Sequence, residues 1–245
     1  MDEQSQYLVT GDSALTIEMG KVISEETNQR IRAMVTAIEE ATLEGVEELV
    51  PTYCTILVIY NPVIIGYSEL KEKLMKLEGT LEKRSFQMPE VVHIPTFYGG
   101  SAGMDIEFVA AHNELMVEDV IRLHSEAYYL VYMLGFTPGF PYLGGMTPSI
   151  ATPRLEVPRE KISAGSVGIA GNQTGIYPFE SPGGWQIIGK TPLNLFNVYE
   201  KPYSLLQSGQ YVKFDPIDEA AYHQILEEIQ LGRYKVYKSP YERTK

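Results

Sequence analysis

The stretches GFTPGFPYLGGMTP, residues 135–148, and SAGSVGIAGNQTGIYPFESPGGWQIIGKTP, residues 163–192, alternate glycine, proline and aromatic residues. Glycine permits backbone conformations and close approaches that other residues forbid, whereas proline fixes the backbone in loops. Short apolar runs such as SVGIAG and WQIIG lie between the turn residues, and the runs YYLVYML and YVKF flank the two stretches. Short strands separated by turn clusters are typical of a β-barrel or closed sandwich, which is the fold we expect here.

The N-terminal third of the sequence alternates strand and helix patterns. In residues 7–20 two apolar stretches surround a turn, and after Ser24, a good helix N-cap, apolar residues recur at helical spacing. Strands are predicted over 46–50 and 52–60, followed by a helix that ends at Gly79. This order predicts a small α+β sandwich.

A change of composition toward glycine and proline follows the charged segment 80–90 and marks a domain boundary. We therefore expect an N-terminal α+β domain over residues 1–88 and a β-barrel domain over residues 89–245. The barrel domain is predicted to end with a helix over 216–231 and a basic, tyrosine-rich tail from Arg233, which we expect to be mobile.

The composition is that of an acidic globular protein. Hydrophobic residues make up 44% of the chain, and 32 acidic side chains against 20 basic ones give a net charge of −12. This charge repels phosphate backbones and anionic membranes, so neither nucleic acid nor membrane is an expected partner. The polar start MDEQSQY does not resemble a secretory signal, and we expect a cytoplasmic protein. The single Cys54 and four histidines without ligand spacing predict neither a disulfide nor a metal site.

Residues 184–191, GWQIIGKT, match the phosphate-loop pattern letter by letter. A phosphate loop follows a buried strand and opens a helix, whereas FESPGG precedes this segment and Pro192 follows it. Trp185 and the two isoleucines would also crowd a backbone that wraps phosphates. We therefore interpret the segment as a barrel strand that ends in a turn.

Residues 99–103, GGSAG, have the spacing of a nucleophile elbow between a strand and a helix. An elbow serine needs a histidine base later in the chain, and no pattern selects one among the three available. These are His112, His124 and His223. We favour the alternative that the glycines form a turn in which Ser101 or Asp105 caps the next helix.

The two glycine- and proline-rich stretches also carry rings that offer stacking surface. They are Phe136, Phe140, Tyr142, Tyr177 and Trp185. The combination predicts a rigid pocket with aromatic walls. Polar groups able to orient a ligand in it are Arg154, Arg159, Asn172 and Gln173, with His124 nearby in sequence.

The same stretches, together with TGDSAL at 10–15, EFVAAHN at 107–113 and HSEAYYLVYMLGFTPGFPYLGG at 124–145, carry a family resemblance. The chain resembles the family of KipI, allophanate hydrolase subunit 1 and the B subunit of bacterial ATP-dependent 5-oxoprolinase, and the 5-oxoprolinase B subunits most closely. The resemblance covers nearly the whole chain. It implies an N-terminal α+β domain followed by a cyclophilin-like β-barrel.

The resemblance also implies a role within a complex. Family members act with two partners, the PxpA-like and PxpC-like subunits, to convert 5-oxo-L-proline, ATP and water to L-glutamate, ADP and phosphate. The implied enzyme is 5-oxoprolinase (EC 3.5.2.9), with a chain that is inactive alone and with ATP bound at the level of the complex. The alternatives are KipI-type inhibition of a sporulation histidine kinase and an allophanate hydrolase-like role. Peptidyl-prolyl isomerisation has only the barrel fold in its favour.

No catalytic residue is assigned from the sequence. The family usually has proline where Met104 and Ser163 stand, and arginine where Lys190 stands. The residues expected to form the pocket or to contact a partner are His124, Phe136, Pro138, Gly139, Phe140, Tyr142, Arg154, Arg159, Gly171, Gln173, Tyr177, Pro178, Gly184 and Trp185.

Overall fold

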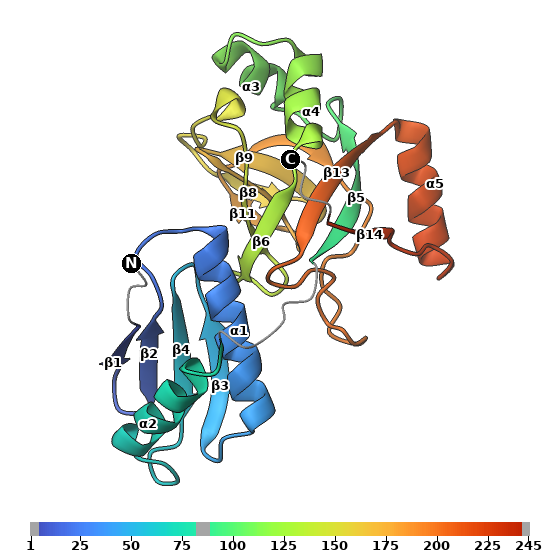
Figure 1. The fold of residues 1–245 in the computed structure, drawn as a ribbon. Helices are drawn as coiled ribbons and strands as arrows, with labels where there is room; N and C mark the ends of the chain where they lie inside the picture. The colour runs from blue at the N-terminus through green and yellow to red at the C-terminus, as the bar shows by residue number, and fades with distance from the viewer. Residues whose placement is uncertain (1–4, 82–88, 242–245) are drawn as a thin grey trace. The chain divides into compact units, whose positions relative to one another are not determined.

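The computed structural model describes residues 5–81 and 89–241 (Figure 1). The chain divides into two compact units, residues 1–87 and 88–245, each with its own hydrophobic core. The first unit is a small sandwich, and the second contains a nearly closed, barrel-like sheet. The predicted α+β class with a β-barrel is confirmed. No helix within the described ranges is both long and apolar enough to cross a membrane.

The first unit has two layers, a four-stranded antiparallel sheet and two helices on one of its faces (Figure 1). In sheet order the strands are β1 (Gln6–Val9), β2 (Ala14–Glu18), β4 (Thr55–Tyr60) and β3 (Val46–Pro51). The helices are α1 (Glu25–Ala41) and α2 (Tyr67–Glu78). Alternate residues of β2 and β4, such as Ile17 and Ile56, are buried in the same cluster as the apolar stripe of α1.

Helix α1 begins at the predicted cap. The Ser24 backbone is extended, and its Oγ accepts a hydrogen bond from the Thr27 N–H at 3.1 Å, which satisfies one of the free N–H groups of the first turn. Three residues of the predicted stripe, Ile31, Met34 and Ile38, are buried against the sheet. Local capping and helical spacing therefore account for this helix.

The second unit is built on an eight-stranded sheet. Its main order is β10-β9-β12-β5-β13-β6-β7. The end strands β10 and β7 pack side by side, so the sheet curls into a nearly closed barrel. The strands are β5 (Glu90–Tyr98), β6 (Tyr129–Leu134), β7 (Pro141–Gly144), β9 (Ser166–Ala170), β10 (Gln173–Ile176), β12 (Gln186–Lys190), β13 (Tyr211–Ile217) and β14 (Lys238–Pro240).

Strand β5 organises the barrel. It runs parallel to β13 over seven residue pairs, from Val91 to Phe97, and its two ends pair antiparallel with β14 and β12. A second, two-stranded sheet of β8 (Arg159–Ile162) and β11 (Ser181–Gly183) lies outside the main order, and a 3₁₀ turn, η2, spans Pro148–Ile150.

Three helices accompany the barrel: α3 (Ile106–His112), α4 (Val117–Glu126) and α5 (Glu219–Gln230). Figure 1 shows α3 and α4 together at one end of the barrel, whereas α5 lies alongside β5. The predicted helix over 216–231 begins later than expected. Strand β13 continues to Ile217 because it pairs with β5 as far as Phe97, and Asp218 then caps α5.

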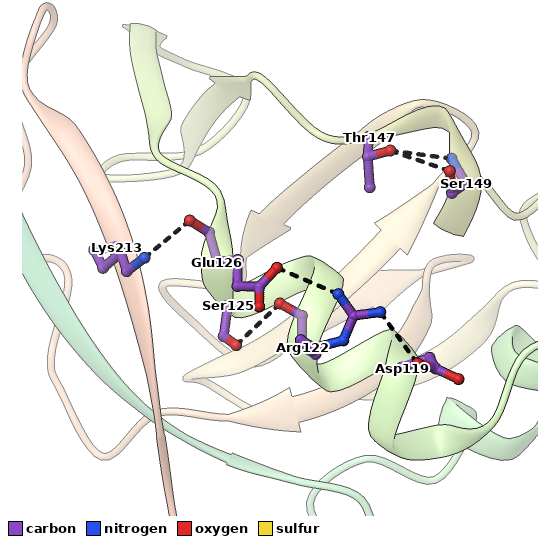
Figure 2. A network of polar contacts seen from close by, with 7 residues as sticks. All are labelled: Asp119, Arg122, Ser125, Glu126, Thr147, Ser149 and Lys213. Carbon is purple, nitrogen blue, oxygen red and sulfur yellow. Dashed lines mark hydrogen bonds and ion pairs between the residues drawn. The ribbon is translucent and has the colours of Figure 1, made fainter. Parts of the chain in front are cut away.

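The C-terminal end of α4 is closed by side chains and not by a glycine (Figure 2). Lys213 of β13 donates from Nζ to the Glu126 carbonyl at 2.9 Å, and its ammonium lies 4.6 Å from the Tyr128 ring centroid. Arg122 pairs with Asp119 at 3.1 Å on the exposed side of the helix. Cations near the last turn favour the helix dipole, so β13 and α4 are tied together where β6 begins.

The tail from Arg233 is ordered as far as Tyr241, so its predicted mobility is wrong for the described part; residues 242–245 lie outside the described ranges. Strand β14 pairs with the N-terminal half of β5. The ring of Tyr241 stacks on Tyr211 with centroids 3.8 Å apart, and Tyr237 packs on His93 at 4.5 Å. Strand pairing and ring stacking with distant residues hold the tail in place.

Removing residues 235–245 should therefore destabilise the barrel. The deletion uncovers Val91 and Tyr211, which are buried. We expect the free energy of unfolding in urea to fall by about 2–4 kcal/mol, since burial of one large apolar side chain contributes about 1.5–3 kcal/mol. Deletion of residues 242–245 alone is the control. An unchanged urea midpoint for the longer deletion would contradict a stabilising role for β14.

Candidate functional site

Five rings predicted to face one pocket do pack together on the outside of the barrel sheet. We call Phe136, Phe140, Tyr142, Tyr177 and Trp185 the aromatic cluster. Phe140 is its centre, with ring centroids of the other four at 5.7, 5.5, 6.0 and 5.7 Å, respectively. All four contacts are edge-to-face, with interplanar angles between 72° and 90°. This geometry is favourable for aromatic quadrupoles, so the cluster is a rigid unit.

A pair of glycines makes room for Trp185. Gly168 of β9 and Gly175 of β10 are opposite each other in the antiparallel ladder. A Cβ on Gly175 would lie 3.1 Å from the Trp185 ring and 3.3 Å from Phe140, and a Cβ on Gly168 would lie 3.3 Å from the Trp185 Cβ. Trp185 and Phe140 therefore lie on sheet backbone that carries no side chains.

The loop that carries Phe136 is tight and strained. Gly135 donates from its N–H to the Phe140 carbonyl at 3.1 Å, and Gly139 has a φ of 78°. Phe136 has a φ of 66°, the left-handed region that non-glycine residues adopt at a cost of about 1–3 kcal/mol. Its side chain is nevertheless 74% exposed, and Pro138 beside it is exposed as well. Strain is thus maintained at an exposed aromatic residue, and backbone strain of this kind clusters at functional sites.

Two arginines border the cluster. The Arg154 guanidinium lies 5.9 Å from the Trp185 ring centroid. Arg159 donates from Nη1 to the Trp185 carbonyl at 3.3 Å and from Nη2 to Asp105 Oδ1 at 2.6 Å. Burial raises the pKa of Tyr177, against the opposing effects of a hydrogen bond with the Trp185 backbone and of the two arginines. Tyr177 is therefore a neutral phenol at neutral pH.

His124 does not lie on the aromatic cluster, because α4 directs it into the barrel interior, where it is 0% exposed. Its Nδ1 lies 2.7 Å from Tyr98 Oη, and its Nε2 lies 2.8 Å from Thr174 Oγ1. The Thr174 hydroxyl donates to the Gly168 carbonyl at 3.0 Å, so it accepts from Nε2–H, and Nδ1 accepts from Tyr98. Burial lowers the pKa of His124 to about 3. The histidine is a neutral structural group.

Residues 5–206 match the family model for the carboxyltransferase domain, subdomain C and D. A 5-oxoprolinase B subunit from Bacillus subtilis (strain 168) is 44% identical over 229 residues, which cover 89% of this chain and 95% of that protein. The chain belongs to the family of the carboxyltransferase domain, subdomain C and D. The resemblance to the 5-oxoprolinase B subunits noted from the sequence is confirmed.

Two solved structures are also similar to this chain. The conserved uncharacterised protein PH0987 from Pyrococcus horikoshii is 51% identical, covers 89% of this chain and 100% of that one, and has a TM-score of 0.53. TTHA0988 is 34% identical, covers 84% of this chain and 40% of that one, and has a TM-score of 0.74. The fold of this chain is therefore found in solved relatives.

The remaining predicted residues lie around the cluster in different roles. Gly139 packs against Phe196, Pro178 follows Tyr177, and Gly184 lies next to Trp185 near Pro158. Gly171 and Gln173 lie at the turn between β9 and β10, where Gly171 exchanges backbone hydrogen bonds with Thr152 at 2.7 and 3.3 Å. That turn is a support of the barrel and not part of the ring contacts described above.

Both motif coincidences have structural explanations. Residues 186–190 of the phosphate-loop match form strand β12, which pairs antiparallel with β9 and β5. Ser101 lies in the turn between β5 and α3, and none of the described histidines hydrogen-bonds to it. Asp105 is at the N-cap position of α3 but makes no side-chain cap; its Oδ2 accepts the Ile187 N–H at 2.6 Å. The interpretations of a strand and a glycine turn hold, and that of a side-chain cap does not.

Sequence reasoning missed Gly168, Gly175 and the bridging carboxylate of Asp105. The two glycines stood in a run already rich in glycine, and only the β9–β10 register shows that they face each other. Asp105 binds Arg159, which lies 54 residues later, so no local pattern announces the pair. Pairing between distant segments is the information that the sequence pattern lacked.

The burial of His124 predicts a pH dependence. Its pKa is lowered from 6.5 to about 3 in the folded chain, so the unfolded state binds the proton more tightly. The lowered pKa of His124 therefore leaves the free energy of unfolding unchanged above pH 6.5. As the pH falls from 6.5 toward 3, it destabilises the folded chain increasingly. The free energy of unfolding should fall by about 1.4 kcal/mol per pH unit in this window. Urea unfolding at pH 7 and pH 5 measures it.

The matched variant is His124→Gln, which retains polar atoms but does not titrate. It should be less stable than wild type at pH 7 and should lose about 2 kcal/mol less between pH 7 and pH 5. If wild type and His124→Gln lose the same free energy of unfolding between pH 7 and pH 5, His124 does not determine this pH dependence.

Proposed function

We propose that this chain is the B subunit of an ATP-dependent 5-oxoprolinase, acting with PxpA-like and PxpC-like partner subunits. The reaction is 5-oxo-L-proline plus ATP and water to L-glutamate, ADP and phosphate (EC 3.5.2.9). The observation that carries the proposal is the 44% identity to the 5-oxoprolinase B subunit of Bacillus subtilis over 95% of that protein. The chemistry of the aromatic cluster supports a chain that completes a shared site.

The cluster supplies recognition surface without acid–base chemistry. Tyr177 is held neutral by burial, and His124 is neutral and inside the barrel. Within the described residues no group of three or more histidine, cysteine, aspartate or glutamate side chains is arranged to hold a metal ion. A nucleophile or general base for ring opening is therefore sought in a partner, and this chain is inactive alone.

The exposed part of the cluster is the proposed partner contact. Phe136 and Pro138 project from a strained loop, and Arg154 lies over Trp185. Aromatic and arginine side chains dominate the binding energy of protein interfaces, and a rigid loop loses little entropy when it binds. ATP belongs to the complex and is not assigned to residues of this chain.

Reconstitution tests the proposal. The chain and its two co-expressed partner subunits should release glutamate from 5-oxoproline with ATP hydrolysis, and activity should fall to background when this chain is omitted. The chain alone should show neither reaction. Full activity of the two partners without this chain would refute the proposal. If this chain instead binds the dimerisation domain of a histidine kinase and adds nothing to the 5-oxoprolinase activity, KipI-type inhibition becomes the better assignment.

Phe136→Gly separates recognition from stability. Glycine adopts a positive φ without strain, so the variant should be as stable as wild type or slightly more stable. Loss of the exposed ring should weaken binding to the partner subunits by about 2 kcal/mol, roughly thirtyfold in Kd. Calorimetric titration measures the affinity and thermal unfolding measures the stability.

Phe108→Ala is the matched control, because Phe108 is an exposed phenylalanine on α3 that stacks on His112, outside the aromatic cluster. This variant should bind the partners as wild type does. Wild-type affinity of Phe136→Gly would remove the loop from the proposed contact.

A further inference from the structure

The proposed function does not use two of the sequence motifs, GGSAG at 99–103 and GWQIIGKT at 184–191, and the structure places them side by side. Residues 99–103 form a turn that packs against the end of β12, the strand that carries Lys190 of the phosphate-loop match. Gly99 donates from its N–H to the Ile188 carbonyl at 3.0 Å, and a Cβ on Gly103 would collide with that carbonyl. Only glycine permits this approach, and it brings Ser101 beside Lys190.

A second glycine turn, at Gly165, packs against the residue that follows Lys190. The Gly165 carbonyl accepts the Thr191 N–H at 2.9 Å, and a Cβ on Gly165 would collide with the Thr191 carbonyl. Ser166 and Lys190 are cross-strand partners in the β9–β12 ladder, so their side chains leave the same face of the sheet as neighbours.

Between these turns lies a cavity of about 80 Å³. Its polar lining consists of cationic and hydroxyl side chains and the rest is apolar; no carboxylate of the described chain lines it. The polar residues are Ser101, Arg159, Lys161, Ser163, Ser166 and Lys190. In a chain with a net charge of −12, a cavity with this lining is a departure from the general surface.

The cationic side chains of the cavity are not equally available. Arg159 is paired with Asp105 at 2.6 Å, and Lys161 with Glu180 at 3.0 Å. Lys190 is half-buried and forms no ion pair with any described residue. The cavity therefore has an excess positive charge that its own surroundings do not neutralise.

Ser166 provides an independent indication. It is 5% exposed and lines the cavity, and its hydroxyl makes no hydrogen bond with the described part of the chain. The hydroxyl oxygen itself remains accessible, because Gln186 Oε1 is the only fully buried side-chain oxygen or nitrogen of the described residues without a partner. Beside the half-buried ammonium of Lys190, this hydroxyl is ready to donate to an anion.

We propose that this cavity binds a small oxyanion, a carboxylate or phosphate group, through Lys190, Ser166 and the hydroxyl of Ser101. The volume is well below the roughly 300–1,000 Å³ of pockets that enclose whole drug-sized ligands. The cavity therefore takes an anionic head group and excludes a complete nucleotide. The inference depends on the cavity alone and does not rest on the proposed function.

The experiment is an NMR titration of the purified full-length chain at low ionic strength, following assigned backbone amides. Inorganic phosphate and acetate are the two ligand arms, and acetamide is the uncharged control. At least one anion should give saturable shifts of the Ser101 and Ser166 amides by about 10 mM, and acetamide should give none. The anion that binds more tightly identifies the class of oxyanion.

Three variants test the assignment. Lys190→Met should raise Kd by about tenfold or more, the size expected for loss of a charge-assisted hydrogen bond. Lys190→Arg should keep binding within a few-fold of wild type, and Ser166→Ala should weaken it. As a control, Lys76→Met, in α2 of the first unit, removes the same charge from an exposed lysine that does not line the cavity and should leave Kd unchanged.

Absence of saturable shifts with both anions would overturn the proposal, as would equal Kd values for wild type and Lys190→Met. Shifts that leave Ser101 and Ser166 unmoved would also overturn it, because the anion would then be bound elsewhere. If Lys190→Met does not fold, the wild-type shifts together with the Ser166→Ala and Lys190→Arg titrations decide the question.

Discussion

Strand β12 is held by backbone approaches that only glycine permits, and both surfaces described for the barrel depend on it. Gly103 lies against the Ile188 carbonyl, Gly165 against the Thr191 carbonyl, and Gly168 places its would-be Cβ 3.1 Å from the Gln186 carbonyl. A Cβ on Gly103 or Gly165 would displace the backbone at the end of β12, whereas a Cβ on Gly168 would require its neighbours to shift by a few tenths of an ångström. Since Trp185 precedes the strand and Lys190 ends it, the aromatic cluster and the cavity proposed to bind an oxyanion are positioned by one set of contacts.

The Asp105–Arg159 pair fastens this arrangement. Asp105 is 9% exposed, and its carboxylate accepts from the Ile187 N–H and from Arg159, which also donates to the Trp185 carbonyl. The start of α3, strand β12 and the short β8–β11 sheet are thereby joined through one carboxylate. Removing either partner would leave a largely buried charge without compensation, which is more costly than loss of the attraction itself.

The parts of the fold that the sequence predicted well, and the ring packing that followed from it, are those governed by neighbours in the chain. Ser24 and the apolar spacing of α1 act within one turn of helix, and the five rings stand out in a glycine-rich stretch. The tail was misjudged because its order comes from pairing with β5 and from stacking on Tyr211, which lie far away in sequence. His124 was misplaced because a histidine near a helix end carries no local sign that it points into a barrel. The opposition of Gly168 and Gly175 likewise exists only in the strand register, so residues that form a surface are easier to predict than those that position it.

The two titratable groups that burial perturbs most clearly near the site agree with the proposed role in recognition. Burial keeps both Tyr177 and His124 in their neutral forms at neutral pH, so neither ring is poised to exchange a proton with a substrate. The glycine-constrained backbone instead holds Phe136 and Lys190 in place before any partner or ligand arrives. In the proposed complex, binding energy from such preformed groups would not be consumed in ordering loops and would remain available to orient groups of the partner subunits.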